Sequence, residues 1–144
     1  MPAEADGLSS RKYNALPMKQ RRTKVFFDGG ARPNPGPIEA AVVLRGHVHV
    51  YDDLGTGSSH DAEWLALICA LKLCQAQDLR DFVLIGDALQ VVDQARAALA
   101  QSSAPTGHAA TFLALALQSR PGHVRWIKRQ HNLAGIALAA RRQR

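Results

Sequence analysis

The stretch that decides the fold is KVFFDGGARPNPGP, residues 24–37. Residues 24–27 form a short, largely apolar run rich in β-formers and closed by glycines, which predicts a buried strand. Residues 29–37 hold three Gly, three Pro and one Asn, which predicts a series of turns and no helix. Asp28 is therefore expected where the strand ends. An ionised carboxylate in that position is costly to bury unless a cation or hydrogen-bond donors satisfy it.

Asp28 has two interpretations. Taken alone, Asp28-Gly29 is a pair typical of a hairpin turn. Two further acids favour a site instead: Asp87 follows a second unbroken apolar run at 82–85, and Glu63 lies near the start of an apolar helix at 61–76. Strand, helix and strand form a crossover unit, so both strands can be parallel, with their carboxyl ends at the edge of the sheet where α/β proteins bind ligands. We therefore expect the three carboxylates to converge on a site suited to Mg²⁺ or Mn²⁺. The alternative for Glu63 is an ordinary acid in a first helical turn.

The remaining elements complete an α/β pattern. Residues 40–44 and 47–51 are strand-like runs separated by a short glycine-containing break, so with the first strand they predict an antiparallel meander. The helix at 61–76 is apolar almost all round and should be the central one. The other expected elements are strands at 82–85 and 123–128 and helices at 89–100, 109–118 and 132–142. His47 and His49 share one face of a strand; they could bind a metal, but a solvent-facing pair is favoured.

The length of 144 residues and the composition indicate one domain, at 24–144, preceded by a flexible basic arm at 1–23. No run of eighteen apolar residues and no secretory signal is visible, which predicts a protein that does not bind membranes. Cys69 and Cys74 face different directions on the predicted helix, so no disulfide is expected between them. These features favour a reduced, cytoplasmic compartment. The oligomeric state stays open.

Charge is unevenly distributed along the chain. Residues 1–24 carry six Lys/Arg and two acids, residues 25–93 carry four Lys/Arg and ten acids, and residues 94–144 carry eight Lys/Arg and no acid. An acidic middle between basic ends suits a polyanion held at its flanks and handled with metal ions at the centre. The alternative, a solvated basic surface, is less favoured because the last third is free of acids.

Four motifs in sequence order resemble type 1 ribonuclease H across residues 24–142. They are FDGGARPNPGP at 27–37, AEWLAL at 62–67, GDALQVV at 86–92, and WI at 126–127 followed by NLAGIALA at 132–139. The resemblance implies a ribonuclease H-like fold: a five-stranded mixed sheet, made of a three-strand antiparallel meander plus parallel strands, with helices on both faces. It also implies endonucleolytic cleavage of the RNA strand of an RNA–DNA hybrid.

The resemblance assigns roles to individual residues. Asp28 would bridge two Mg²⁺ or Mn²⁺ ions about 4 Å apart. Glu63 would hold the ion on the leaving-group side, and Asp87 would complete the cluster. The positions implied to contact nucleic acid are Gly29, Gly30, Asn34, Ser59, His60, Arg129 and Asn132. Ser59 and His60 stand where the family commonly has Asn residues that read ribose 2′-hydroxyls.

The main departure is at the family's fourth carboxylate. The family pattern is Asn-x-x-Ala-Asp-x-Leu-Ala, and here Gly135 and Ile136 replace the Ala-Asp pair. No acid follows Asp93, so the metal position on the nucleophile side would lack its ligand. The resemblance implies two ions at the site, and this loss makes a single ion the alternative. His131 or His123 could help as a ligand or base, although either fits a surface histidine.

Three functional interpretations follow. The first is a hybrid-cleaving enzyme with weakened activity. The second is a non-catalytic module that binds RNA–DNA hybrid or other nucleic acid through a degenerate site. The third, a structural adaptor with no nucleic-acid role, is disfavoured by the three acids and the basic ends.

Overall fold

A computed structural model of the chain describes residues 22–101 and 104–142. The predicted arm therefore lies almost wholly outside the described residues. Arg22 already forms an ion pair with Asp81 at 2.9 Å, and Thr23 begins the first strand, so the folded domain starts slightly before residue 24. The elements are β1 Thr23–Ala31, β2 Gly36–Leu44, β3 His47–Tyr51, β4 Thr56–Gly57, α2 Ser59–Ala76, β5 Phe82–Gly86, α3 Leu89–Ala100, α4 Gly107–Ala116, β6 His123–Trp126, the 3-10 turn η1 Arg129–His131 and α5 Leu133–Arg142.

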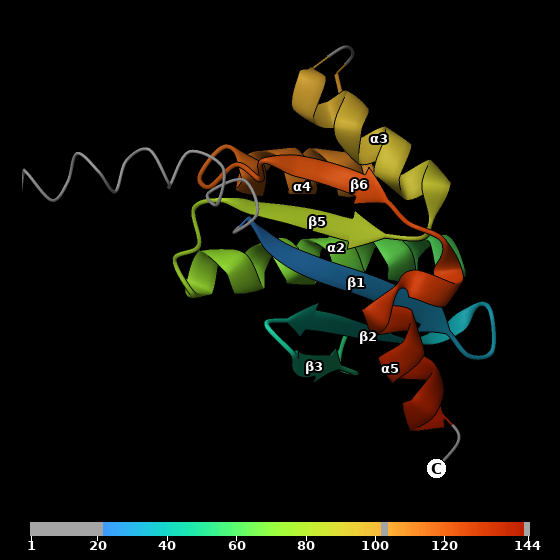
Figure 1. The fold of residues 1–144 in the computed structure, drawn as a ribbon. Coiled ribbons are helices and arrows are strands. Elements are labelled where there is room, and N and C mark those ends of the chain that lie inside the picture. The colour runs from blue at the N-terminus through green and yellow to red at the C-terminus, as the bar shows by residue number, and fades with distance from the viewer. Residues whose placement is uncertain (1–21, 102–103, 143–144) are drawn as a thin grey trace, which may run out of the picture.

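The sheet has the strand order β3-β2-β1-β5-β6 (Figure 1). Strands β1, β2 and β3 pair antiparallel, and β1, β5 and β6 pair parallel. This confirms the mixed five-stranded sheet. The two-residue β4 pairs with β2 as a sixth strand.

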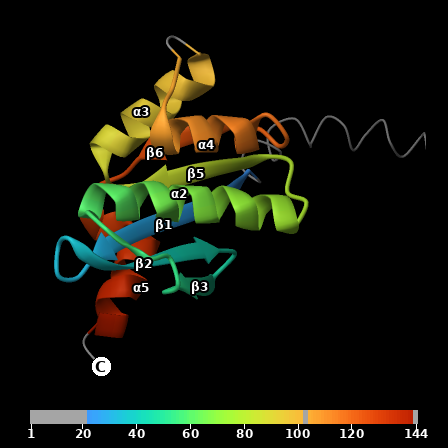
Figure 2. The same cartoon turned by 180° about the vertical axis from the view of Figure 1, so that it is seen from behind.

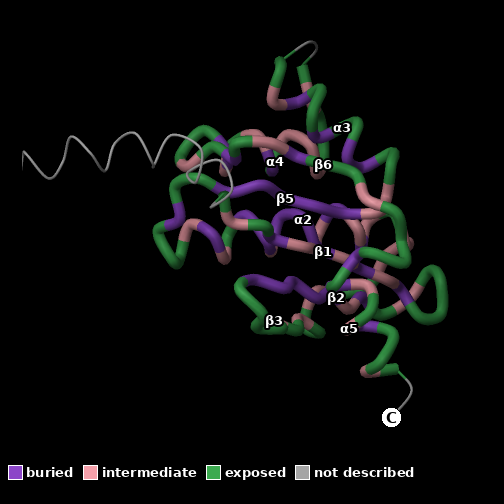
Figure 3. Tube along the Cα trace, viewed as in Figure 1, coloured by how far each residue is buried: buried purple, intermediate pink, exposed green. Residues whose placement is uncertain are grey.

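Helices cover both faces of the sheet, as expected (Figures 1 and 2). Alternation along β1 directs Val25 and Phe27 into the large core with α2, whereas Phe26 packs on the opposite side with Ala134 and Leu138 of α5. Every residue of β5 is buried, and its tube is purple throughout in Figure 3. The central position of α2 is confirmed, because it packs against β1, β2 and α4.

The first strand is longer than the sequence predicted. Strand β1 continues through Asp28 and the two glycines to Ala31, and Asp28 and Gly29 pair with residues of β2. The hairpin-turn interpretation of Asp28-Gly29 is therefore wrong, and the turn lies at residues 32–35. Gly29 serves close packing instead, since a Cβ there would overlap the backbone carbonyl of Ala62 in α2.

Helix α2 begins two residues earlier than predicted. Ser58 is its N-cap, and Ser58 and Asp61 form a reciprocal capping box with both hydrogen bonds at 3.0 Å. The acid of the first turn is consequently Asp61, and Glu63 lies just beyond that turn. The alternative that Glu63 is an ordinary acid of the first helical turn is wrong for this reason. The capping bonds fix where α2 starts and hence where Glu63 points.

The two cysteines, the two histidines of β3 and the lengths of the helices bear on the other predictions. Cys69 and Cys74 are both free thiols. His47 is exposed and His49 half-buried on β3, the edge strand. Within the described part of the chain, no helix is long and apolar enough to cross a membrane.

Candidate active site

Three carboxylates meet at one edge of the sheet. Asp28 comes from β1, Glu63 from α2 and Asp87 from the residue after β5, and one carboxylate oxygen of each lies within 4.8 Å of the other two. They line a cavity of about 820 Å³. Among the described residues, this is the one cluster of acids, histidines and cysteines with metal-ligand spacing.

Strand register explains why two of the acids meet. Phe26 of β1 pairs in parallel with Ile85 of β5, so Asp28 and Asp87, each two residues further along, reach the same edge. Glu63 is carried by α2, which covers the face of the sheet opposite to α5. The backbone N–H of Gly29 donates to Oε1 of Glu63 at 3.3 Å, which ties the helix side chain to the strand that carries Asp28.

Electrostatics show that the cluster is short of positive charge. Burial, followed by repulsion from Asp87, raises the pKa of Asp28 to about 7. Burial, followed by repulsion from Asp28, raises the pKa of Glu63 to about 8. The cations Arg142 and Arg129 lower the pKa of Asp28, but by less than burial and Asp87 raise it. Converging oxygen ligands that repel one another fit a divalent cation, which would relieve this repulsion.

Asn132 positions Asp87. Its side-chain NH₂ donates to Oδ2 of Asp87 at 2.8 Å and to the carbonyl of Phe27 at 3.0 Å, while its Oδ1 accepts from the backbone N–H of Ala134 at 3.1 Å. Asn132 is fully buried. The expectation that it contacts nucleic acid is wrong, because its amide is committed to orienting Asp87 and capping α5.

Two arginines flank the acids. Nε of Arg129 lies 3.8 Å from Oδ1 of Asp87, and the Arg129 side chain is 86% exposed, so it is available to a ligand. Arg142, at the end of α5, lines the same cavity. Arg142 was not among the site residues predicted from the sequence. Its helical spacing of three from Ala139 and seven from Gly135, both of which line the cavity, places it on the same side of α5 and is the signal that identifies it.

Ile136, which replaces the family's fourth carboxylate, faces the site. Ile136 lines the cavity and is 51% exposed, so it does not belong to the core. A Cβ on the preceding residue, Gly135, would lie 3.5 Å from Oδ2 of Asp28 and 3.6 Å from Oδ2 of Asp87. Helix α5 therefore packs against the acids, but neither Gly135 nor Ile136 has a side-chain atom that can bind a metal ion.

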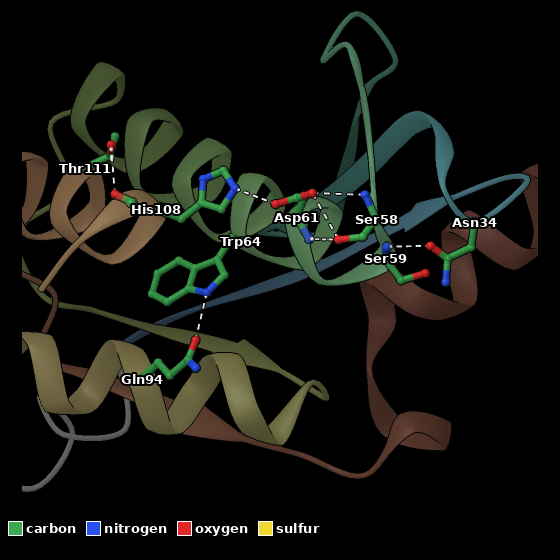
Figure 4. Close-up of polar contacts among 9 residues, drawn as sticks. Asn34, Ser58, Ser59, Asp61, Trp64, Gln94, His108 and Thr111 are labelled. Carbon is green, nitrogen blue, oxygen red and sulfur yellow. Dashed lines mark hydrogen bonds and ion pairs between the residues drawn. The ribbon is translucent and has the colours of Figure 1, made fainter.

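Asn34 and Ser59 lie side by side (Figure 4). Oδ1 of Asn34 accepts a hydrogen bond from the backbone N–H of Ser59 at 3.0 Å. Ser59, Gly29 and Gly30 line the cavity with the acids. His60 instead lines a different cavity, next to Trp64. The structure thus places Ser59 at the cavity of the acids and His60 at another, although both positions were predicted to contact nucleic acid.

The network beside His60 braces the start of α2 (Figure 4). A ring nitrogen of His108 in α4 lies 3.0 Å from Oδ1 of Asp61, and Nε1 of Trp64 donates to Oε1 of Gln94 in α3 at 3.0 Å. The His108 and Trp64 rings stack at 6.4 Å. These contacts join three helices next to the site.

Neither candidate helper histidine joins the acids. His131 is exposed in η1 and does not line the cavity. His123 pairs with Val83, four residues before Asp87, and its ring lies 2.8 Å from Nη2 of Arg96. His123 is therefore at the far end of β6 from the site, which contradicts the alternative that it helps as a ligand or base.

A family model described as reverse transcriptase-like matches residues 26–142. The chain belongs to this family. No curated protein matches it. Among solved structures, ribonuclease H1 of the halophilic archaeon Halobacterium salinarum NRC-1 is 27% identical with a TM-score of 0.62, covering 81% of this chain and 93% of that one.

Two further structures share the fold. The N-terminal ribonuclease H domain of a Mycobacterium tuberculosis protein is 24% identical with a TM-score of 0.62, covering 81% of this chain and 94% of that one. The compost-derived LC11 ribonuclease H1, solved in complex with an RNA/DNA hybrid, is 22% identical with a TM-score of 0.64, covering 81% of this chain and 92% of that one. The resemblance to type 1 ribonuclease H and the ribonuclease H-like fold are confirmed.

Proposed function

We propose that this member of the family is a metal-dependent endonuclease that cleaves the RNA strand of RNA–DNA hybrids. The observation that carries the proposal is the convergence of Asp28, Glu63 and Asp87, with ligand atoms within 4.8 Å of one another in an open cavity. Membership of the reverse transcriptase-like family and similarity to ribonuclease H1 structures support the same reaction.

The three carboxylates would hold Mg²⁺ or Mn²⁺. A divalent ion bound there supplies Lewis-acid stabilisation of a phosphoryl oxygen and lowers the pKa of a bound water. The protein's own part is to fix its ligands: Asn132 holds one oxygen of Asp87, and the backbone N–H of Gly29 holds one oxygen of Glu63. Fixed ligands lower the reorganisation that catalysis requires.

The surroundings of the acids support a nucleic-acid substrate. Arg129 lines the cavity and supplies a cation for phosphate. Ser59 lines it too, and its hydroxyl can contact the ribose 2′-OH by which a protein distinguishes RNA from DNA. The acid-free segment 94–144, with eight Lys/Arg, adds a sequence-independent attraction for the backbone.

A second candidate function is binding of the hybrid without cleavage. The observation that favours it is Ile136, an apolar side chain that lines the cavity where the family has a metal ligand. In this case the cations beside the acids would hold the hybrid while water activation fails.

One experiment separates the two functions. A labelled RNA–DNA hybrid is incubated with the protein in Mg²⁺ and in Mn²⁺, and binding of the same hybrid is measured in EDTA. Cleavage that disappears in Asp28→Asn supports the nuclease. Tight hybrid binding with no cleavage in either metal supports the binding module, and neither binding nor cleavage contradicts both functions.

A further inference from the structure

The guanidinium of Arg142 lies on the side of the cavity next to Gly30 and forms no ion pair with the three acids. Gly30 lies two residues after Asp28 in β1, so both positions face α5, about 7 Å apart. A Cβ on Gly30 would overlap Nη2 of Arg142. The guanidinium of Arg142 therefore occupies the space where Gly30 has no side chain.

Arg142 is held in this place by Glu39. Nε of Arg142 donates to Oε2 of Glu39 at 2.8 Å, and the Glu39 side chain is only 17% exposed. Glu39 is the direct cross-strand partner of Gly30, so the carboxylate that anchors the arginine stands beside the gap that the arginine fills. A half-buried, charge-assisted bond of this kind fixes a side chain more firmly than an exposed one.

The neighbouring arginine shows that this arrangement is particular to Arg142. Nη1 of Arg141 donates to Oε1 of Glu39 at 2.8 Å, and its Nη2 donates to Oδ2 of Asp52 at 2.7 Å. Arg141 does not line the cavity of the acids. Of the three guanidinium nitrogens of Arg142, only Nε has a hydrogen-bond partner among the described residues. Both Nη groups are therefore left for a ligand in the cavity.

We infer that Arg142 is a phosphate-binding residue of this site, gripping a backbone phosphate of the hybrid on the side where Ile136 provides no fourth carboxylate. Ile136, Ala139 and Arg142 follow one another at a spacing of three along the cavity-facing side of α5. The helix thus places a fork of N–H donors near Asp28 but no anion, and such a fork matches two phosphate oxygens. The inference rests on the proposed function, because it requires that the hybrid enters this cavity.

Hybrid binding in EDTA tests the inference without any contribution from cleavage. We expect Arg142→Ala in the full chain to weaken hybrid affinity about tenfold at 0.1 M salt and to flatten the log–log salt dependence by about 0.7–0.9, the slope of one phosphate contact. Arg142→Lys keeps the charge but loses the fork, so it should restore the slope and only part of the affinity. Arg141→Ala is the matched control, and its affinity should stay within about twofold of wild type.

Thermal melts of the same proteins identify a purely structural effect. Equal affinities and slopes for Arg142→Ala and Arg141→Ala would overturn the inference. So would a loss of hybrid affinity in Arg142→Ala that is matched by a fall in its melting temperature, because lost folding would then explain the lost binding. If the wild-type protein binds and cleaves the hybrid in that case, the proposed function stands and only the role of Arg142 fails. If wild type neither binds nor cleaves the hybrid, both fail.

Discussion

Replacing Ile136 by Asp tests whether the site is a nuclease site short of one ligand. Ile136 is 51% exposed and lines the cavity of the three acids, so the new carboxylate should point at them and not into the core. Removing a half-buried isoleucine side chain costs about 1 kcal/mol of apolar burial. A new charge about 6 Å from a cluster carboxylate adds at most about 3 kcal/mol of repulsion at an effective dielectric of 20, before protonation relieves it.

We therefore expect Ile136→Asp to lose about 2–3 kcal/mol of stability in EDTA, or roughly 6–10 °C in melting temperature for a domain of this size. Magnesium should reverse the loss, because a folded state saturated at one hundred times its Kd gains about 2.7 kcal/mol. The gain on adding Mg²⁺ should be larger than in wild type, and hybrid cleavage should be at least tenfold faster.

Two variants control for side effects. Ile136→Asn removes the same apolar side chain without adding charge, so its melting temperature should fall less in EDTA and respond to Mg²⁺ as wild type does. Ala140→Asp adds the same charge to an exposed position of α5 that does not line the cavity, and should change neither the Mg²⁺ response nor cleavage. If Ile136→Asp is destabilised equally with and without Mg²⁺ and cleaves no faster, position 136 does not contribute to a metal site.

Four other predictions follow, three from the structure and one from the charge of the segment 1–21. Asp28→Asn should abolish cleavage in the hybrid assay, and activity equal to wild type would contradict the site. Because the pKa of Asp28 rises from 3.8 to about 7 on folding, its protonation stabilises the metal-free fold; this contribution is complete below about pH 4 and is lost as the pH rises through 7. In EDTA, urea unfolding should show wild type losing more stability than Asp28→Asn between pH 4 and pH 8, and parallel curves would contradict the pKa. Gly29→Ala should lower the free energy of unfolding in urea by about 3 kcal/mol, because the new Cβ meets the Ala62 carbonyl. Gly135→Ala should raise it by up to about 1 kcal/mol through helix propensity, because the nearest neighbour of its Cβ is 3.5 Å away. Deleting residues 1–21 should flatten the salt dependence of hybrid affinity by about 0.7–0.9 per lost phosphate contact, and an unchanged slope would show that the segment binds no phosphate.

The order of strands and helices and the three acids could be read from the sequence alone. Apolar runs, their periodicity and the glycines and prolines between them are local signals, and each acts within a few residues. The crossover rule then places Asp28 and Asp87 at one edge of the sheet. The replacement at Ile136 is likewise visible in the sequence, because the surrounding motif fixes its position.

Tertiary structure decided everything that depends on long-range contacts. The length of β1 follows from pairing with β2 and from the approach of α2 to Gly29, neither of which leaves a local trace in the sequence. Asn132 meets the carbonyl of Phe27 across 105 residues, and Arg142 meets Glu39 across 103. Such pairs form only when the sheet brings distant segments together, because the free energy of closing so long a loop is repaid by the packed core and not by the pair itself. That is why a buried amide that orients an acid, and an arginine that fills the space beside a glycine, emerge only from the folded chain.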